Sequence, residues 1–410
     1  MNLFEDLKWR GLIKDIAGSE DDLQKVLNGN SFTFYWGTDP TADSLHLGHY
    51  SSLCMAKRLA NAGHKPLLLC GGATGRIGDP RPTAEREIIS EETVNKNIEG
   101  IKAQIKKLVP SAELVDNYEW LKDFSMLNFL RDVGKYINVN YMLDKDIIRR
   151  RLENGITFAE FAYMLLQGYD FYHLFTERNC IMQVAGSDQW GNITTGVDLI
   201  RKCTEKTAYA FTMPLILDST GKKFGKSEGN ALWLNKEKTS AYEIYQYLIN
   251  TEDSKVLEYL KVFTFLSKEQ IEQIYEEQQK APETRIAQKT LAWEVVKDIH
   301  GKEEADNAVN VSQKLFKGDF EGLSVKDILS GMKGVPNFKF QKEEPLIDVL
   351  VNNKIASSKR EARDFLKSNA ISVNGKVVSD ENYLITKEIA LEGKLIIFRR
   401  GKKKYFICEL

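Results

Sequence analysis

Two histidines lie three residues apart in the segment HLGH, His46 to His49. The segment follows an apolar run and a turn at Asp39-Pro40, and it opens an amphipathic pattern that continues to about Ala62. We therefore expect both imidazoles at a helix N-terminus, where unpaired backbone N–H groups and the positive end of the helix dipole favour an anion. Gly48 lets a bulky nucleotide approach the backbone, so the phosphates of ATP suit this segment.

Two other interpretations of the same histidines are a capping turn with a chance pair and one half of a metal site. A zinc site would need two further ligands nearby, and the sequence contains no suitable cluster of cysteine and histidine. We expect no metal site built by the protein.

A second candidate segment, GKKFGKSEG, places Lys223 and Lys226 on either side of Phe224 and a glycine. It lies between a strand expected over residues 213–218 and the apolar run 231–234. A loop of lysine and glycine is usually only solvated. Two lysines in a mobile loop can also close over a triphosphate and neutralise the charge that develops as pyrophosphate leaves.

The elements that must position these residues alternate between short apolar runs and amphipathic helical patterns over the first 230 residues. This alternation predicts an α/β fold with a mostly parallel sheet. Strands expected at Phe32–Trp36, Pro66–Cys70 and Ile181–Ala185 each run into a polar or glycine-rich turn. Since ligands of open α/β sheets bind at the carboxyl ends of strands, the three turns predict one composite site.

A helix expected around the segment YMLLQGYDF adds a wall to this site. Tyr163 and Gln167 are four residues apart and Asp170 follows three further along. At helical spacing the three side chains share one face.

The length of 410 residues favours two or three domains, because single cores rarely exceed about 300 residues. We expect a Rossmann-like catalytic domain at 1–230, a helical domain at 231–335 and a small α+β domain at 341–410. Helix-start patterns at Ser240, at Ser267 with Gln270, and at Pro282 support the second, and a segment with the composition of a linker, SGMKGVPNFKFQKEEP, precedes the third.

The composition places the protein in a reducing, aqueous compartment. Its five cysteines are scattered, its N-terminal segment carries two acidic residues where a targeting peptide would not, and no apolar run is long enough to span a membrane. We expect a cytoplasmic protein with no membrane contact.

The last 70 residues hold 14 Lys and Arg against 10 Asp and Glu, whereas the remainder holds 43 against 48. A helix expected over SSKREARDFLK, starting at Ser357 or Ser358, carries an outward stripe of basic residues, and Asn374-Gly375 predicts a type I′ hairpin. Such a basic helix beside basic hairpins suits contact with a phosphate backbone, although a solvated basic face has the same pattern.

Taken together, HLGH and KFGKS resemble the HIGH and KMSKS segments of class I aminoacyl-tRNA synthetases. The segments YWGTDPTADSLHLGH, GGATGRIGDP, YDF and QVAGSDQWGN are similar to those of the bacterial tyrosyl-tRNA synthetase family, and the C-terminal part resembles an S4 RNA-binding domain. The resemblance covers essentially the whole chain. It implies activation of L-tyrosine by ATP with Mg²⁺, transfer to the 3′ end of tRNA(Tyr), and a homodimer to which residues 138–152 contribute.

The resemblance also implies roles for individual residues. Those implied to bind tyrosine are Tyr35, Asp79, Tyr163, Gln167, Asp170, Gln183 and Gln189. Those implied to bind ATP are Gly37, Asp39, His46, His49, Ser52, Gly186, Asp188 and Lys226, and those implied in catalysis are Thr41, His46, His49, Lys223 and Lys226. The tRNA contacts are implied at Lys359, Arg360, Arg363 and Lys367.

The chain departs from the family pattern at Trp36, where a smaller residue is usual beside the ribose, at Thr38 in place of Phe, and at Ser52 in place of Thr. Asp188 also suits a helix N-cap, and the two roles are compatible.

Two other functions fit part of this pattern. Tryptophanyl-tRNA synthetases and simpler nucleotidyltransferases share the expected fold, but Tyr35, Asp170 and the S4-like part argue against them. A non-catalytic RNA-binding protein with an inactive synthetase domain is disfavoured by the intact HLGH and KFGKS segments.

Overall fold

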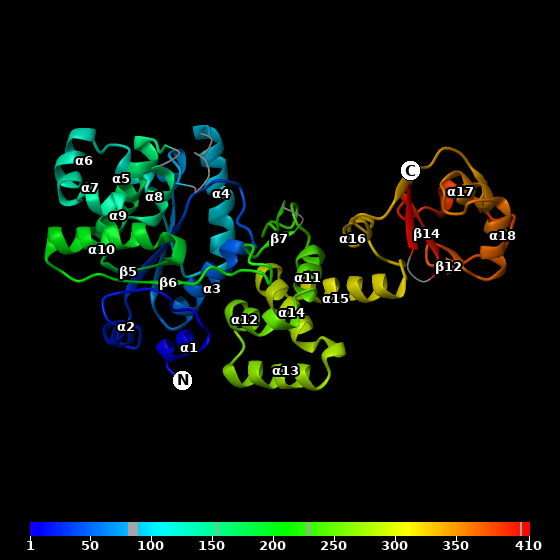
Figure 1. Ribbon diagram of the computed structural model, residues 1–410, viewed down its shortest axis with the longest axis horizontal. Helices are drawn as coiled ribbons and strands as arrows, with labels where there is room; N and C mark the ends of the chain where they lie inside the picture. The colour runs from blue at the N-terminus through cyan, green and yellow to red at the C-terminus, as the bar shows by residue number, and fades with distance from the viewer. Residues whose placement is uncertain (81–88, 153–154, 228–229, 402–403) are drawn as a thin grey trace. The chain divides into compact units, whose positions relative to one another are not determined.

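The computed structural model describes residues 1–80, 89–152, 155–227, 230–401 and 404–410, with only the backbone described for Asp146, Ile147, Lys226 and Ser227. The chain forms two compact units (Figure 1). The first consists of Met1–Thr239 with Thr251–Leu291, and the second of Ser240–Asn250 with Ala292–Leu410.

A six-stranded sheet forms the centre of the first unit, in the order β1-β6-β5-β2-β3-β4. All neighbouring pairs are parallel except β1, which runs antiparallel to β6. The strands are β1 Ile16–Ala17, β2 Thr33–Thr38, β3 Lys65–Cys70, β4 Glu113–Asp116, β5 Cys180–Gly186 and β6 Tyr209–Met213. The α/β class and the three expected strands are therefore confirmed.

Helices cover both faces of this sheet (Figure 1), which explains the continuous apolar run of β3. The helices α3 (Leu47–Asn61) and α4 (Glu91–Leu108) lie on one face, and α9 (Phe158–Arg178) and α10 (Trp190–Thr204) on the other. From β2 the chain winds to β3 and β4 in one direction, then returns to β5 and β6 on the other side. This reversal beside β2 creates the crevice in which doubly wound sheets bind ligands.

The remaining helices of the first unit surround this framework. They are α1 Leu3–Trp9, α2 Glu20–Leu27, α5 Tyr118–Leu121, α6 Met126–Asp132, α7 Val139–Leu143, α8 Asp146–Leu152, α12 Asp253–Phe263 and α13 Lys268–Lys280, with α14 Ile286–His300 extending into the second unit. The capping box predicted for Ser267 and Gln270 forms as expected.

One expected strand, at residues 213–218, does not form. The strand β6 ends at Met213, and the following residue is Pro214, which has no N–H to donate to a sheet. Residues 216–224 instead form a tight hairpin, in which the Phe224 amide donates to the Ile216 carbonyl at 3.0 Å. Beyond it lie the short antiparallel strands β7 (Lys226–Ser227) and β8 (Asn230–Ala231).

The second unit contains helices and a second sheet. The helices are α11 Ala241–Ile249, α15 Lys302–Lys317, α16 Val325–Gly331, α17 Leu346–Asn352 and α18 Lys359–Lys367. The strands of the sheet lie in the order β12-β11-β14-β15-β9. They are β9 Asn337–Lys339, β11 Ile371–Val373, β12 Lys376–Val377, β14 Leu395–Arg400 and β15 Lys404–Glu409. Two further strands, β10 Glu344–Pro345 and β13 Leu384–Ile385, pair with each other apart from this sheet.

Two local predictions for this unit can be compared with the backbone. Asn374 and Gly375 both have positive φ, 49° and 85°, and connect β11 to β12 as a two-residue turn, so the predicted hairpin is confirmed. The segment expected to be a linker contains β9, which pairs in parallel with β15 and so belongs to the sheet. Across both units, no helix within the described residues is both long and apolar enough to cross a membrane.

Candidate active site

Three polar side chains meet beneath the carboxyl end of β2 and β5. Tyr35 of β2, Gln183 of β5 and Asp170 of α9 are each only 2% exposed. The Tyr35 hydroxyl and the Gln183 Oε1 make no hydrogen bond of ordinary geometry with the described residues, although the Gln183 side chain lies close enough to Tyr35 to favour its ionised form slightly. Burial, together with the nearby Asp170 carboxylate, raises the pKa of Tyr35 well above its ordinary value. Buried polar atoms without partners are costly, so this group is built to receive a polar ligand.

Two residues of the β4–α5 region donate hydrogen bonds to the Asp170 carboxylate. The Asn117 amide donates to its Oδ2 at 2.9 Å, and the Trp120 indole donates to its Oδ1 at 2.8 Å. Burial raises the pKa of Asp170 to about 7 despite these two hydrogen bonds, which favour the ionised form. The two hydrogen bonds therefore fix the orientation of the carboxylate, and its oxygens can still accept further hydrogen bonds from a ligand.

A chain of hydrogen bonds leads from this carboxylate toward the turn after β2. Asn117 also donates to the Thr74 hydroxyl at 2.9 Å, and Thr74 donates to Asp39 Oδ1 at 2.8 Å. The other oxygen of Asp39 accepts from the Tyr163 hydroxyl at 2.8 Å. Asp39 and Tyr163, expected on different substrates, are thus direct neighbours.

A second polar cluster surrounds Asp79. Its two oxygens accept from Gln189 at 2.9 Å and from Asn192 at 3.2 Å. Asn192 also donates to Gln167 Oε1 at 2.9 Å. Burial and the Asp39 and Asp79 carboxylates raise the pKa of Tyr163 well above its ordinary value, so the two clusters share one electrostatic environment.

The two histidines lie at the first turn of α3, as predicted. His46 is the N-cap residue, and its Nδ1 accepts from the Gly48 amide at 3.0 Å. The imidazoles of His46 and His49 stack with their centroids 3.9 Å apart. A Cβ on Gly48 would lie 2.7 Å from the His46 ring, so only glycine leaves room for this arrangement.

The lysine segment lies directly against this turn. A Cβ on Gly225 would be 2.8 Å from the Gly48 amide and from the Leu47 Cβ. The backbone of 45–47 pairs with that of 232–234, through the Leu47 amide to the Leu232 carbonyl at 2.9 Å and the Leu234 amide to the Leu45 carbonyl at 2.8 Å. Segments that are remote in the sequence are therefore joined at the N-terminus of α3.

Phe224 holds the lysine segment against α12. It is buried and stacks on Phe263 of α12 at 4.5 Å between ring centroids, with the Tyr259 ring at 4.7 Å. The neighbouring Lys223 is exposed, and the side chain of Lys226 lies outside the described residues. The aromatic contacts fix the backbone of a segment in which Lys223 faces outward.

The other expected nucleotide residues are placed individually. Gly37 is exposed at the second-last position of β2, and Thr41 is exposed in the turn that follows. The Ser52 hydroxyl lies 3.8 Å from the Met213 sulfur. Gly186 is the last residue of β5, and a Cβ added to it would lie 2.7 Å from the Asp188 carboxylate. Asp188 itself is exposed in a short 3₁₀ turn. Within the part of the chain that the structure describes, no hydrogen bond joins Asp188 to the two polar clusters around Asp170 and Asp79.

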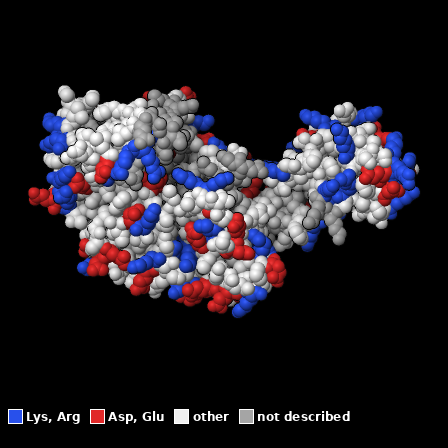
Figure 2. All heavy atoms as spheres, viewed as in Figure 1, with Lys and Arg blue, Asp and Glu red and all other residues white. Residues whose placement is uncertain are grey.

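The four basic residues expected to contact tRNA all lie exposed on α18, whose N-cap is Ser358. Figure 2 shows many Lys and Arg side chains over this C-terminal region. Two of the four form ion pairs, Lys359 with Asp348 at 2.6 Å and Arg363 with Glu381 at 3.1 Å. Exposed pairs of this kind contribute little and can be exchanged for phosphates.

Sequence reasoning missed Thr74, Asn117, Trp120 and Asn192. Asn117 follows β4 directly, so the rule that ligands bind at carboxyl ends of strands could have identified it. The roles of the others depend on how α5, α10 and the turn after β3 pack, which no local pattern gives.

Comparison with known proteins gives the same assignment for both ends of the chain. Residues 27–317 match the family of class I tRNA synthetases for tryptophan and tyrosine. Residues 327–408 match the C-terminal domain of tyrosine–tRNA ligases.

Full-length relatives are similar throughout. A tyrosine–tRNA ligase of Streptococcus agalactiae serotype V is 47% identical over 418 residues and one of Streptococcus pneumoniae is 46% identical over 416, covering 100% and 99% of both chains respectively. A C-terminally truncated mitochondrial tyrosyl-tRNA synthetase of Aspergillus nidulans has 35% identity and a TM-score of 0.70, over 77% of this chain and 94% of that one. The chain belongs to the tyrosine–tRNA ligases, a family of class I aminoacyl-tRNA synthetases.

Proposed function

We propose that the buried group of Tyr35, Asp170 and Gln183 binds the phenol of L-tyrosine in the ligase reaction of this family. The observation that carries this assignment is the unsatisfied Tyr35 hydroxyl and Gln183 Oε1 beside an oriented carboxylate. A phenol is both a donor and an acceptor, so one hydroxyl can satisfy several of these atoms. Phenylalanine would leave them unpaired and is disfavoured for that reason.

The ammonium group of tyrosine is assigned to the cluster around Asp79. Two carboxylates, Asp39 and Asp79, lie here and accept hydrogen bonds from Tyr163, Gln189 and Asn192. A carboxylate is the expected partner of an ammonium group, and Gln167 is a further polar neighbour in the same cluster.

ATP is assigned to the turn where the histidine and lysine segments meet. Gly37, Asp39, Ser52, Gly186 and Asp188 are proposed for the adenosine side, and Thr41, His46, His49, Lys223 and Lys226 for the phosphates. The tyrosine carboxylate attacks the α-phosphorus of ATP, the bond to the bridging oxygen breaks, and pyrophosphate leaves. Catalysis rests on positioning and on stabilisation of charge on the phosphates, with no protein nucleophile.

Mg²⁺ fits this site as a companion of the ATP phosphates. Within the described residues no three His, Cys, Asp or Glu side chains come together to hold a metal ion. Mg²⁺ commonly keeps several waters and binds through substrate phosphates, where it shares the charge of the leaving pyrophosphate.

Tyrosine-dependent exchange of labelled pyrophosphate into ATP tests the first step. The wild-type chain is expected to catalyse this exchange with tyrosine and not with phenylalanine. The Tyr35→Phe variant should bind tyrosine more weakly by about 1–3 kcal/mol, because one ligand hydrogen bond is lost. A folded chain without exchange activity would overturn the assignment.

In the second step a ribose hydroxyl at the 3′ end of tRNA(Tyr) attacks the carbonyl of tyrosyl-adenylate. We assign catalysis to 1–230 and tRNA binding to the helical part, 231–335, and the S4-like part, 341–410. On α18, Lys359, Arg360, Arg363 and Lys367 would contact phosphates, and the basic excess of the last 70 residues supports this division.

A homodimer is proposed through the helices that precede α9. Exposed apolar side chains gather on α6, α7 and the start of α9, among them Leu127 at 81% and Phe158 at 67% exposed. Leu127→Glu should shift sedimentation velocity from dimer to monomer, and a wild-type monomer would contradict the proposal. A cytoplasmic location is proposed as well, in line with a reaction that uses cellular tRNA.

A further inference from the structure

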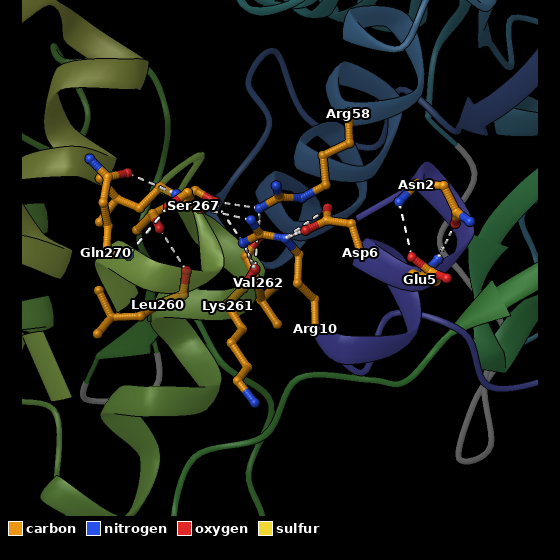
Figure 3. Close-up of polar contacts among 12 residues, drawn as sticks. Asn2, Glu5, Asp6, Arg10, Arg58, Leu260, Lys261, Val262, Ser267 and Gln270 are labelled. Carbon is orange, nitrogen blue, oxygen red and sulfur yellow. Dashed lines mark hydrogen bonds and ion pairs between the residues drawn. The ribbon is translucent and has the colours of Figure 1, made fainter. Parts of the chain in front are cut away.

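The C-terminal end of α12 is held by two arginines (Figure 3). Arg10 donates to the carbonyls of Lys261 at 3.0 Å and Leu266 at 2.7 Å. Arg58, from the last turn of α3, donates to the carbonyls of Lys261 and Val262 at 3.2 Å each and to that of Thr264. The two guanidinium groups therefore bind the Lys261 and Val262 carbonyls, which the helix end leaves without intrahelical partners, and the carbonyls of Thr264 and Leu266 just beyond it.

Both guanidinium groups are deeply buried, at 6% exposed for Arg10 and 7% for Arg58. Asp6 neutralises Arg10 through contacts of 2.8 and 2.9 Å. Burial and the neighbouring Arg10 lower the pKa of Arg58 to about 10, so it remains cationic at neutral pH. Cations at a helix C-terminus are stabilised by the helix dipole, which explains why two are tolerated side by side.

The same helix end supports the lysine segment. Phe263, the last residue of α12, stacks on Phe224 on one side and on Tyr50 of α3 at 6.0 Å on the other. One turn earlier, the Tyr259 hydroxyl donates to the Leu217 carbonyl at 3.0 Å, in the hairpin that leads to Lys223. The helix α12 thus packs against the lysine segment and supports it. The helix α3 carries the histidines at its N-terminal end and Arg58 in its last turn.

We propose that Arg58, assisted by Arg10, is a positioning residue for tyrosine activation. Arg58 and Arg10 tie the end of α12 to α3 and α1. In this way they fix the position of the lysine segment relative to His46 and His49. The inference rests on the proposed role of these two segments in ATP binding. Arg58 lies at the opposite end of α3 from His46 and His49, so its effect must pass through Phe224 and the lysine segment.

The test uses pyrophosphate exchange by the full chain with Arg58→Met, which keeps much of the side-chain volume but removes the charge and the donors. The rate of exchange at saturating tyrosine is expected to fall about 10-fold or more, while the dissociation constant of tyrosine changes less than about 2-fold. Arg58→Lys, which keeps the charge but has a single donor group, should lose less. Arg178→Met removes an exposed arginine of α9 paired with Glu113 and should match the wild type.

A double-mutant cycle separates positioning from a general effect on folding. In a background with Lys223→Ala and Lys226→Ala, Arg58→Met should reduce exchange by no more than about 2-fold, because the groups it positions are already gone. Losses that multiply in full would overturn the inference, as would weakened tyrosine binding in Arg58→Lys. If Arg58→Met does not fold, the same cycle with Arg58→Lys decides. Absence of exchange in the wild type would instead overturn the proposed function.

Discussion

The Asp170 carboxyl has an unusual surrounding for an ionised group. It accepts hydrogen bonds from two neutral side chains, and no described cation pairs with it. Burial raises its pKa from 3.8 to about 7. In the folded protein this group therefore keeps a proton over a pH range in which the unfolded chain has released it.

This difference predicts how stability depends on pH. Because the folded state binds more protons between pH 4 and 7, the stability from Asp170 is full at low pH and is lost as pH rises through about 7. Asp170→Asn removes this term. Its free energy of unfolding, relative to the wild type, should rise from pH 4 to 7 and then level off, as measured by urea unfolding with circular dichroism. Parallel curves for the two proteins would show that Asp170 is ionised throughout.

At this scale the sequence identified Tyr35 and Asp170 as partners only through a resemblance. Helical spacing placed Tyr163, Gln167 and Asp170 on one face, and α9 confirms that they share a helix. Spacing within one helix could not show that Trp120 would support Asp170, because the contact depends on how a four-residue helix packs against a strand end.

Among the elements, the contact between Gly225 and the first turn of α3 brings the lysine segment next to the histidines. Gly225 has a φ of 86°, and a Cβ there would strike Leu47 and Gly48. Gly221, in the same hairpin region, has a nearly identical φ of 81° with open space around it. The two glycines therefore share backbone strain but differ in steric contact.

This pair gives a matched test. Gly225→Ala should push the lysine segment away from the histidines and lower kcat/KM for ATP in pyrophosphate exchange by about 10-fold or more. Gly221→Ala carries only the backbone cost and should reduce kcat/KM for ATP far less. Equal losses in the two variants would mean that left-handed strain, and not the contact with α3, decides the effect.

Elements governed by local rules could be predicted from the sequence. The parallel strands, the Ser267 capping box and the Asn374-Gly375 turn follow from alternation, capping and positive φ. The strand expected at 213–218 does not form, because Pro214 has no N–H to donate to a sheet even though the residues around it are apolar. The strand β9 was missed because its three residues sit among glycines, prolines and charges, and only pairing with β15 makes them a strand.

For the whole molecule, the division of labour predicts the outcome of a truncation. A chain that ends at residue 335 lacks every strand of the C-terminal sheet, including β9, and also lacks α18. It should retain pyrophosphate exchange within about 2-fold of the wild type, because no residue assigned to tyrosine or ATP is removed. Aminoacylation of tRNA(Tyr) should fall by at least about 100-fold, since the residues of α18 proposed to contact phosphates are removed.

Equal loss of both activities would contradict this division. The charge asymmetry that suggested it could be counted from the sequence, but the ion pairs of Lys359 and Arg363 could not. Their partners, Asp348 and Glu381, lie outside the helix and are brought to it only by the packing of the domain.

The order of the C-terminal sheet has a consequence for biosynthesis. β15 is an interior strand, with β14 on one side and β9 on the other. While the ribosome is still translating the intervening residues, β9 has no neighbour and its backbone groups stay open to water or to other chains. This sheet can close only after residues 404–409 have emerged, so a nascent chain completes the proposed RNA-binding domain last, after the strands and helices proposed to bind tyrosine and ATP.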